Sequence, residues 1–305
     1  MRVQPILCRL HKRCFTGCGK PRRCLRRRFS AAQIHPTALV HPNAAIAASA
    51  SVGPFSIIGQ DVTLGENCVV KSHVCIAGKT GIGEGCTIFP FSTLGEIPQD
   101  KKYGGQQTRL TIGERTTVRE NCTINIGTAE GGGVTRIGSD CLLMASTHVG
   151  HDSIVGNDVV IANGTSLAGH VKIGDYAIVG GLCGIRQHVH IGERAMIGGA
   201  SAVDTNVLPY GLVSGNRAKL RGVNLVGLRR AHVPLEAIKN LLRTFRFLFP
   251  DTLGSSTSAL ARPWDFDSPS ELFERCQRIR CAIAGGEIEG CAMIFAVLDA
   301  IEMDH

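Results

Sequence analysis

The sequence predicts an all-β coil built from short strands, followed by a C-terminal α-helical domain, and three observations lead to this prediction. An aliphatic residue recurs at every sixth position over most of residues 34–203. Glycine is abundant, with 37 residues in a chain of 305, whereas aromatic residues make up only 5%. Apolar residues at helical spacing follow this region. Narrow, regular coils with tight corners fit this composition.

The longest stretch of the six-residue step runs through eleven aliphatic residues without a miss. Its members are Ile34, Val40, Ile46, Val52, Ile58, Leu64, Val70, Ile76, Ile82, Ile88 and Leu94. The step returns from Ile112 to Ile124, and from Ile137 it holds through Val203. With about one aliphatic residue in four, chance gives such a run with a probability on the order of 10⁻⁷, so a repeat architecture is indicated.

Each unit of six combines a large aliphatic residue with a small residue four positions later, as in Ala38, Ser56 and Cys86. Glycine often follows the aliphatic residue directly, which suits a short strand that ends in a corner. This pattern resembles the hexapeptide repeat of left-handed parallel β-helices, in which three units form one triangular coil of 18 residues. The resemblance implies a left-handed β-helix domain over residues 31–215, with about nine coils.

The repeat breaks twice. At the first break, Asp100 and Gln106 occupy two aliphatic positions, so residues 97–109 are predicted to form an excursion loop outside the wall. At the second break the count is one residue too long, which predicts a bulged corner around residues 130–133. The rest of the wall is expected to follow the repeat.

Residues 216–305 are predicted to form the C-terminal α-helical domain. Pro234 precedes apolar residues at helical spacing, which are Leu235, Ile238, Leu241, Leu242 and Phe245. Further helices are predicted over residues 269–284 and 287–303, after a Ser-rich loop at residues 254–258. Helices in this place would cover the strand edges that the open end of a coil exposes.

The net charge of +8 is concentrated in residues 1–30, which hold ten of the 33 Lys and Arg and none of the 25 Asp and Glu. Because the remainder is close to neutral, no nucleic-acid partner is expected for it. An Arg-rich, acid-free segment is typical of a mitochondrial presequence, and the scarcity of Ser and Thr favours the mitochondrial matrix over the plastid. Arg27-Arg28-Phe29 resembles a matrix-protease cleavage site. A basic arm that binds nucleic acid is the alternative.

The thirteen cysteines predict neither a metal site nor disulfides. Five of them occupy the small inward position, where a free thiol behaves as a compact apolar group; they are Cys68, Cys86, Cys122, Cys141 and Cys183. No Cys-x-x-Cys pair has zinc spacing, so no metal or other cofactor is expected. No apolar run approaches the roughly 20 residues of a membrane-spanning helix, so no transmembrane segment is expected.

Five histidines cluster in residues 148–190. Residues 18 apart are expected on adjacent coils about 4.8 Å apart, which places His151 beside Gly169 and Asp152 beside His170, on the outside of the wall. An outward imidazole next to a carboxylate, with a glycine backbone one coil away, suits a general base and an amide donor for an oxyanion. Spacing alone leaves open a surface histidine ladder without a catalytic role.

Several segments together resemble the UDP-N-acetylglucosamine O-acyltransferase family, which catalyses the first step of lipid A synthesis. They are Thr147-His148-Val149-Gly150-His151-Asp152, Leu167-Ala168-Gly169-His170, Ser214-Gly215-Asn216, Gly222-Val223-Asn224-Leu225-Val226-Gly227-Leu228-Arg229-Arg230 and the loop Gln99-Asp100-Lys101-Lys102-Tyr103. The hexapeptides alone indicate only a superfamily, and the other segments make the resemblance specific. It extends from Ile34 to Pro250, and no match is found beyond.

The resemblance implies an enzyme that transfers a (R)-3-hydroxyacyl group from acyl carrier protein to the 3-hydroxyl of UDP-N-acetylglucosamine, as a homotrimer. His151 corresponds to the general base, Asp152 to its orienting partner and Gly169 to the amide that binds the oxyanion. The substrate-binding positions correspond to Gln99, Asp100, Lys102, His148, His170, Gln187, Asn224 and Arg230. Gly199 corresponds to the position that limits acyl length. At His148 and His170 the alternative is simple packing on the wall. For the loop residues it is an ordinary solvated loop, and for Gly199 it is a glycine that only forms a corner.

Three residues depart from the family pattern near these positions, namely Arg186, Val226 and Ala231. They leave open a change in nucleotide binding or in the preferred acyl donor. Two other functions also remain open. A γ-type carbonic anhydrase-like zinc protein shares the fold, although His148-x-x-His151 differs from the ligand spacing of that family. The other alternative is a non-catalytic trimeric hexapeptide scaffold.

Overall fold

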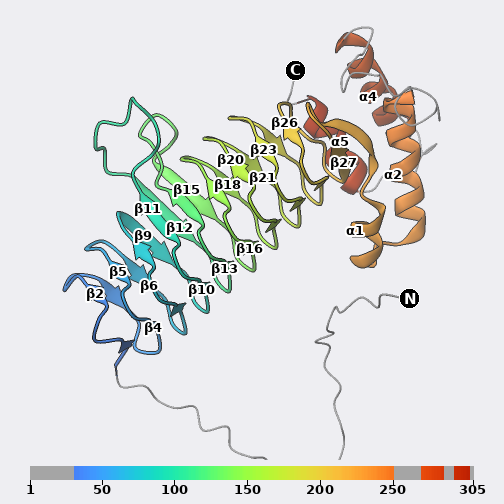
Figure 1. Ribbon diagram of the computed structural model, residues 1–305. Helices are drawn as coiled ribbons and strands as arrows, with labels where there is room; N and C mark the ends of the chain where they lie inside the picture. Colours follow the sequence, from blue (N-terminus) through green and yellow to red (C-terminus); the bar gives the residue numbers. More distant parts are fainter. Residues whose placement is uncertain (1–30, 251–268, 285–291, 303–305) are drawn as a thin grey trace, which may run out of the picture.

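The chain winds into a coil whose walls are three sheets of parallel strands, and helices follow at one end (Figure 1). The computed structural model describes residues 31–250, 269–284 and 292–302. The predicted presequence, the Ser-rich loop, and residues 287–291 and 303 of the third predicted helix lie outside these ranges. Successive strands belong to successive sheets, so three strands complete one coil.

Most strands contain only two residues. Sheet 1 contains β1 Gln33–Ile34, β4 Ser51–Val52, β7 Val69–Val70, β10 Thr87–Ile88, β13 Thr117–Val118, β16 Leu142–Leu143, β19 Val160–Ile161, β22 Ile178–Val179, β25 Met196–Ile197, β27 Gly211–Ser214 and β28 Lys219–Val223. Sheet 2 contains β2 Leu39–Val40, β5 Ile57–Ile58, β8 Cys75–Ile76, β11 Thr93–Glu96, β14 Thr123–Asn125, β17 His148–Val149, β20 Ser166–Leu167, β23 Gly184–Ile185 and β26 Ala202–Val203. Sheet 3 contains β3 Ala45–Ile46, β6 Thr63–Leu64, β9 Lys79–Ile82, β12 Arg109–Ile112, β15 Val134–Ile137, β18 Ile154–Val155, β21 Lys172–Ile173 and β24 His190–Ile191.

Adjacent coils stack with the predicted register of 18 residues, so that Val160 lies beside Ile178. In most of the two-residue strands the first side chain points outward and the second is buried, as in Thr63 and Leu64. Each buried aliphatic residue therefore stacks on the equivalent residue of the next coil, and the interior is filled by the repeat itself.

The first break in the repeat is the excursion loop that the sequence predicts. Ile88 pairs with Val118, thirty residues further on instead of eighteen, so twelve residues leave the wall. They lie between β11 and β12, and the wall resumes at Arg109.

The prediction of a one-residue bulge at the second break was wrong. Val118 pairs with Leu143, twenty-five residues further on, so seven extra residues leave the wall between β14 and β15. An insertion of seven residues, which is one whole unit of six plus one, shifts the six-residue step by the same one residue as a single insertion does. The repeat in the sequence therefore could not distinguish a bulge from the loop of residues 126–133.

The cysteines of the small inward position fill the interior, as predicted. Cys68, Cys86, Cys122, Cys141 and Cys183 are buried, and all have free thiols. Burial raises the pKa of the Cys122 thiol to about 11, which keeps it protonated. These side chains therefore act as small apolar residues.

The C-terminal region begins as sheet and continues as helices. β28 pairs antiparallel with β27, so residues 219–223, which the sequence analysis assigned to the helical domain, extend sheet 1 instead. The antiparallel return does not follow the six-residue step, which is why the repeat gave no sign of it. The described helices are α1 Leu225–Arg230, α2 Leu235–Leu248, α4 Pro269–Ala284 and α5 Ala292–Glu302.

Helix α2 joins the helices to the coil. It packs against β28, α4 and α5 through a buried face that includes Ile238, Leu241, Phe245 and Leu248. Helix α2 thus covers the last strand of sheet 1. None of the helices in the described ranges combines the length and apolarity that crossing a bilayer requires.

The inward and outward positions of one strand give a matched test of this packing. Ile58 is 1% exposed and its neighbour Ile57 is 49% exposed. We expect I58A to lower the free energy of unfolding by about 2–5 kcal/mol, because it leaves a cavity in the stack, and I57A to lower it by less than about 1 kcal/mol. Chemical denaturation monitored by circular dichroism measures both. Equal losses in the two variants would contradict the alternation of the strands.

Candidate active site

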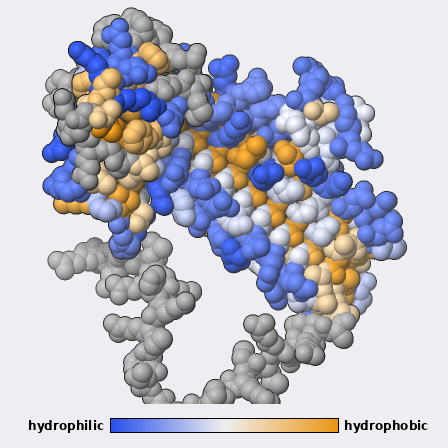
Figure 2. Space-filling model, turned by 180° about the vertical axis from the view of Figure 1, so that it is seen from behind, coloured by the Kyte–Doolittle hydropathy of each residue, from blue (hydrophilic) through white to orange (hydrophobic). Residues whose placement is uncertain are grey.

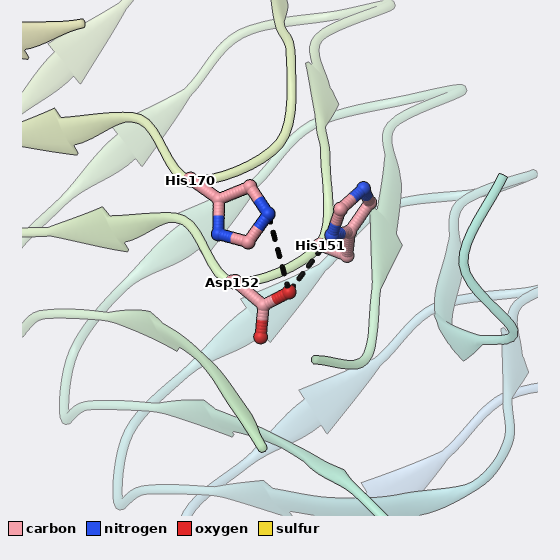
Figure 3. A group of neighbouring side chains, drawn as sticks. All are labelled: His151, Asp152 and His170. Atoms are coloured by element: carbon pink, nitrogen blue, oxygen red, sulfur yellow. Dashed lines mark hydrogen bonds and ion pairs between the residues drawn. The ribbon is translucent and has the colours of Figure 1, made fainter. Parts of the chain in front are cut away.

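The imidazole of His151 is held by the carboxylate of the next residue, Asp152. Both lie in the turn after β17, where the chain passes from sheet 2 to sheet 3. The His151 Nδ1 atom is 2.8 Å from Asp152 Oδ2 (Figure 3). Because an ionised carboxylate only accepts hydrogen bonds, Nδ1 carries the proton and donates it. The Nε2 atom is then unprotonated and can accept a proton from a substrate.

The carboxylate of Asp152 is enclosed by the protein. Its side chain has no solvent exposure, and the loop of residues 126–133 covers it. Thr128 donates twice, from its N–H to Oδ1 at 2.8 Å and from its hydroxyl to Oδ2 at 2.6 Å. The backbone N–H of Asp152 donates to the hydroxyl of Thr135 at 2.8 Å. Asp152 has a φ of 58°, a conformation that is uncommon for residues other than glycine.

Sequence reasoning missed Thr128 and Thr135. The only feature in the sequence that pointed to this part of the chain was the second break in the repeat, which was interpreted as a bulge. A loop at this break brings Thr128 onto the outside of the wall, where it covers Asp152. The outward carboxylate predicted from the repeat is therefore buried by a segment that the repeat does not describe.

Gly169 lies one coil away from His151, as the 18-residue spacing predicts. A Cβ atom on Gly169 would lie 2.7 Å from both Cε1 and Nε2 of His151, so the imidazole faces the backbone of this glycine. Within the described residues, no hydrogen bond uses the Gly169 N–H as donor. This amide is therefore available to an oxyanion beside Nε2.

A second imidazole, that of His170, shares the carboxylate. Its Nε2 atom is 3.9 Å from Asp152 Oδ2, the oxygen that His151 contacts (Figure 3). The His170 ring is perpendicular to that of His151 and stacks on that of His188, with centroids 4.4 Å apart. Burial lowers the pKa of His170, against the opposing effect of the Asp152 charge. His170 is therefore a neutral imidazole beside the base.

His148 lies at the start of β17 with its Nδ1 atom 2.8 Å from the hydroxyl of Thr123. Burial lowers its pKa, and the charge of His151 acts in the same direction. Protonation of His148 is disfavoured for both reasons, so this side chain supplies a polar but uncharged group next to the base.

The excursion loop brings Asp100 within electrostatic range of His170. Its negative charge acts to raise the pKa of His170, so the loop lies on the same side of the wall. The Lys102 N–H donates to Asp100 Oδ1 at 3.0 Å, while the side chains of Gln99 and Lys102 are exposed. The loop thus presents polar groups to the solvent beside His170.

In the described part of the chain, the remaining predicted site residues form no hydrogen bond, ion pair or ring contact with His151. Gln187 is exposed on the coil after Gly169. Gly199 lies at an exposed corner, where a Cβ atom would be 3.4 Å from Gly181 O. The departing residue Arg186 is exposed next to Gln187.

Asn224 and Arg230 lie at the two ends of α1. Asn224 is 8% exposed and caps the helix, because its Oδ1 accepts from the Gly227 N–H at 3.0 Å and its Nδ2 donates to Arg194 O at 2.8 Å. Arg230 is exposed in the last turn. Val226, another departure, is 58% exposed on the same helix.

His151, Asp152 and His170 could together hold a metal ion, because their ligand atoms lie within 4.8 Å of one another. However, the oxygens of Asp152 already accept hydrogen bonds from Thr128 and His151. A metal ion bound to Oδ2, which accepts two of these bonds, would have to displace one of them. The observed bonds favour a base with an orienting carboxylate over a metal site.

Two family models match the chain. The model described as "bacterial transferase hexapeptide (six repeats)" matches residues 134–169, and the second domain of the UDP-N-acetylglucosamine O-acyltransferase model matches residues 206–279. An acyl-[acyl-carrier-protein]–UDP-N-acetylglucosamine O-acyltransferase from Caulobacter vibrioides is 54% identical over 218 residues, which are 72% of this chain and 83% of the relative. The chain belongs to the UDP-N-acetylglucosamine O-acyltransferase family. A relative with the same name from Anaeromyxobacter is 45% identical over 179 residues, 59% of this chain and 70% of that protein.

Solved structures of UDP-N-acetylglucosamine acyltransferases superpose on the chain. The O-acyltransferase from Moraxella catarrhalis has a TM-score of 0.76 and 36% identity, with 88% of this chain and 96% of that chain covered. The acyltransferase from Arabidopsis has a TM-score of 0.72 and 32% identity, with 89% and 96% covered. The fold of this family member is the predicted left-handed parallel β-helix with C-terminal helices. Because the family model extends to residue 279, the prediction that the resemblance ends at Pro250 was wrong.

The close approach of His151 to Gly169 can be tested in this acyltransferase by adding one methyl group. In G169A the Cβ atom would meet the ring at 2.7 Å, so the imidazole must shift. We expect kcat to fall by about 100-fold, because a displacement on the order of 1 Å misaligns the base. Steady-state kinetics measures this loss. G184A is the matched control, since no atom lies within 4 Å of its added Cβ; an equal loss in G184A would contradict the explanation.

The lowered pKa values of His148 and His170 predict a stability change in acid. The unfolded chain binds these protons near the ordinary pKa of 6.5, whereas the folded protein binds them only at lower pH. Folding stability is therefore fully present above pH 6.5 and is lost as the pH falls toward the lowered values. We expect Tm to drop between pH 7.5 and 5.5, and to drop less in the H148Q/H170Q double variant. Identical pH dependence in both proteins would rule out this origin.

Proposed function

We propose that this chain transfers a (R)-3-hydroxyacyl group from acyl carrier protein to the 3-hydroxyl of UDP-N-acetylglucosamine, as in the first step of lipid A synthesis. The names of the relatives support an acyl-carrier-protein donor and this sugar nucleotide as acceptor. The observation that carries the proposal is the arrangement of His151, with Nδ1 bonded to Asp152 and Nε2 facing Gly169.

The geometry accounts for each step of the transfer. The Nε2 atom of His151 takes the proton from the sugar hydroxyl, and the oxygen attacks the thioester carbon. The negative charge that develops on the carbonyl oxygen accepts a hydrogen bond from the Gly169 N–H. When the intermediate collapses, the carbon–sulfur bond breaks and the carrier thiol leaves with the proton from Nε2. Asp152 keeps the ring oriented throughout and stabilises its protonated form.

The substrate contacts follow from the exposed polar groups near the base. Gln99 and Lys102 are exposed on the excursion loop, and Asp100 lies within electrostatic range of His170. These groups suit the sugar hydroxyls and the charged part of a sugar nucleotide. Arg230 is exposed, and a guanidinium group matches the geometry of a diphosphate. Gly199, at its exposed corner, is assigned to the end of the acyl chain.

The active form is proposed to be a homotrimer. Apolar side chains occupy outward positions in successive strands of sheet 1, which are Leu142, Val160, Ile178 and Met196. A band of hydrophobic residues also follows the coil in Figure 2. Burial of such a band between copies of the chain would stabilise an oligomer. Sedimentation equilibrium, which gives the mass in solution, tests the proposal.

The composition of residues 1–30 supports import into the mitochondrial matrix, with removal of this segment. Fusion of residues 1–30 to a fluorescent reporter tests this part of the proposal. Mitochondrial fluorescence would support it, and nuclear accumulation would favour the alternative of a basic nucleic-acid arm.

The central experiment is the acyl transfer assay with purified protein, UDP-N-acetylglucosamine and hydroxyacyl carrier proteins of several chain lengths. We expect 3-O-acylated sugar nucleotide, and we expect H151A to lower kcat by about 10²- to 10⁴-fold, because the general base is lost. His73, on another corner of the coil, provides the control H73A. Absence of product with every donor would favour a non-catalytic scaffold, and stoichiometric zinc in the purified protein would favour the carbonic anhydrase-like alternative.

A further inference from the structure

Thr128 holds both oxygens of the carboxylate that orients the base. Its N–H donates to Asp152 Oδ1 at 2.8 Å and its hydroxyl to Oδ2 at 2.6 Å. The hydroxyl oxygen also accepts from the Gly131 N–H at 3.2 Å, which leaves the hydroxyl proton directed at Asp152. Because Asp152 has no exposed side-chain surface, solvent does not replace these donors.

The loop of residues 126–133 has the small residues that this contact requires. A Cβ atom on Gly131 would lie 2.1 Å from Asp152 Cγ, and one on Gly127 would lie 2.8 Å from Oδ1. The hydroxyl of Thr108 donates to Gly127 O at 2.6 Å and ties the loop to the excursion at the first break. The backbone thus approaches the carboxylate as closely as glycine permits.

A second partner competes for the same oxygen. His170 Nε2 is 3.9 Å from Asp152 Oδ2, whereas His151 Nδ1 is 2.8 Å away. A carboxylate that is free to rotate could turn toward His170 and release His151. Donors on both oxygens remove this freedom, because rotation would break both bonds to Thr128.

We propose that Thr128 is a positioning residue for acyl transfer. It acts through Asp152, by fixing the carboxylate so that His151 Nδ1 is bonded and Nε2 faces Gly169. The inference rests on the proposed function, since it assigns His151 as the base. It adds a role for the second excursion from the repeat, which orients the catalytic carboxylate from outside the wall.

The first experiment compares T128V, T128S and a control in the acyl transfer assay. T128V removes the hydroxyl donor, and we expect kcat to fall by about 10- to 100-fold with little change in KM, because the base loses its orientation. T128S keeps both donors and should stay within about threefold of the wild type. T116V is the matched control, since Thr116 is also buried and donates its hydroxyl to a carbonyl, that of Gly138.

A double-mutant cycle separates positioning from a structural role. In a D152N background Thr128 has no carboxylate to orient, so T128V should lower kcat by less than about threefold further. A structural role would lower kcat equally in both backgrounds and would overturn the inference. Unchanged kcat in T128V would overturn it as well. If T128V does not fold, T128A, with less bulk beside the carboxylate, takes its place with the same expected results.

The protonation of His151 gives a readout that does not depend on turnover. In ¹⁵N-histidine-labelled protein, long-range ¹H–¹⁵N spectra distinguish the Nδ1–H from the Nε2–H form, and H151Q assigns the signal. We expect a single Nδ1–H form in the wild type and a mixture in T128V. An unchanged spectrum would contradict the inference even if the wild type transfers no acyl group, whereas loss of transfer by the wild type contradicts only the proposed function.

Discussion

The backbone hydrogen bonds between coils determine both the stability and the chemistry of this molecule. The His170 N–H donates to His151 O at 2.9 Å, and the His188 N–H donates to Gly169 O at 3.2 Å. Both bonds join residues 19 positions apart, and such bonds hold residues 18 apart side by side in the coils outside the two excursions. A shift of one residue would turn buried aliphatic side chains outward and would also separate His151 from Gly169. The packing of the interior therefore fixes the register between the coils, and with it the position of His151 relative to Gly169.

Burial affects the carboxylate that holds the base and the two imidazoles beside it in different ways. Asp152 is an enclosed carboxylate, and such a charge is costly unless donors surround it. Thr128 and His151 supply those donors. Burial lowers the pKa of His148 and His170, so neither competes with His151 as a cation beside the carboxylate. Of the three imidazoles, that of His151 is the one within hydrogen-bond distance of this carboxylate.

The sequence predicts the regular part of this structure and misses what departs from it. A repeat of six brings His151 beside Gly169 and Asp152 beside His170, because the coils from Ile137 onward keep the same spacing. It could not place Thr128, because the loop of residues 126–133 is bounded by aliphatic residues whose spacing hides one full unit. Nor could it assign Asn224 to the cap of α1. The hydrogen bond between Asn224 and Gly227 follows the antiparallel strand β28, which does not obey the six-residue step. Local periodicity contains no information on contacts made by irregular segments.

The two excursions differ in a way that suits different tasks. In residues 126–133, Thr128 is 7% exposed and bonded to the carboxylate, so this loop is part of the protein framework. In the excursion between β11 and β12, Gln99 and Lys102 are exposed, and the backbone amide of Lys102 bonds to Asp100 within the same loop. A loop that holds a catalytic group gains from burial, because each fixed donor restricts motion. A loop that receives a ligand needs free polar groups, and the excursion between β11 and β12 has them beside His170.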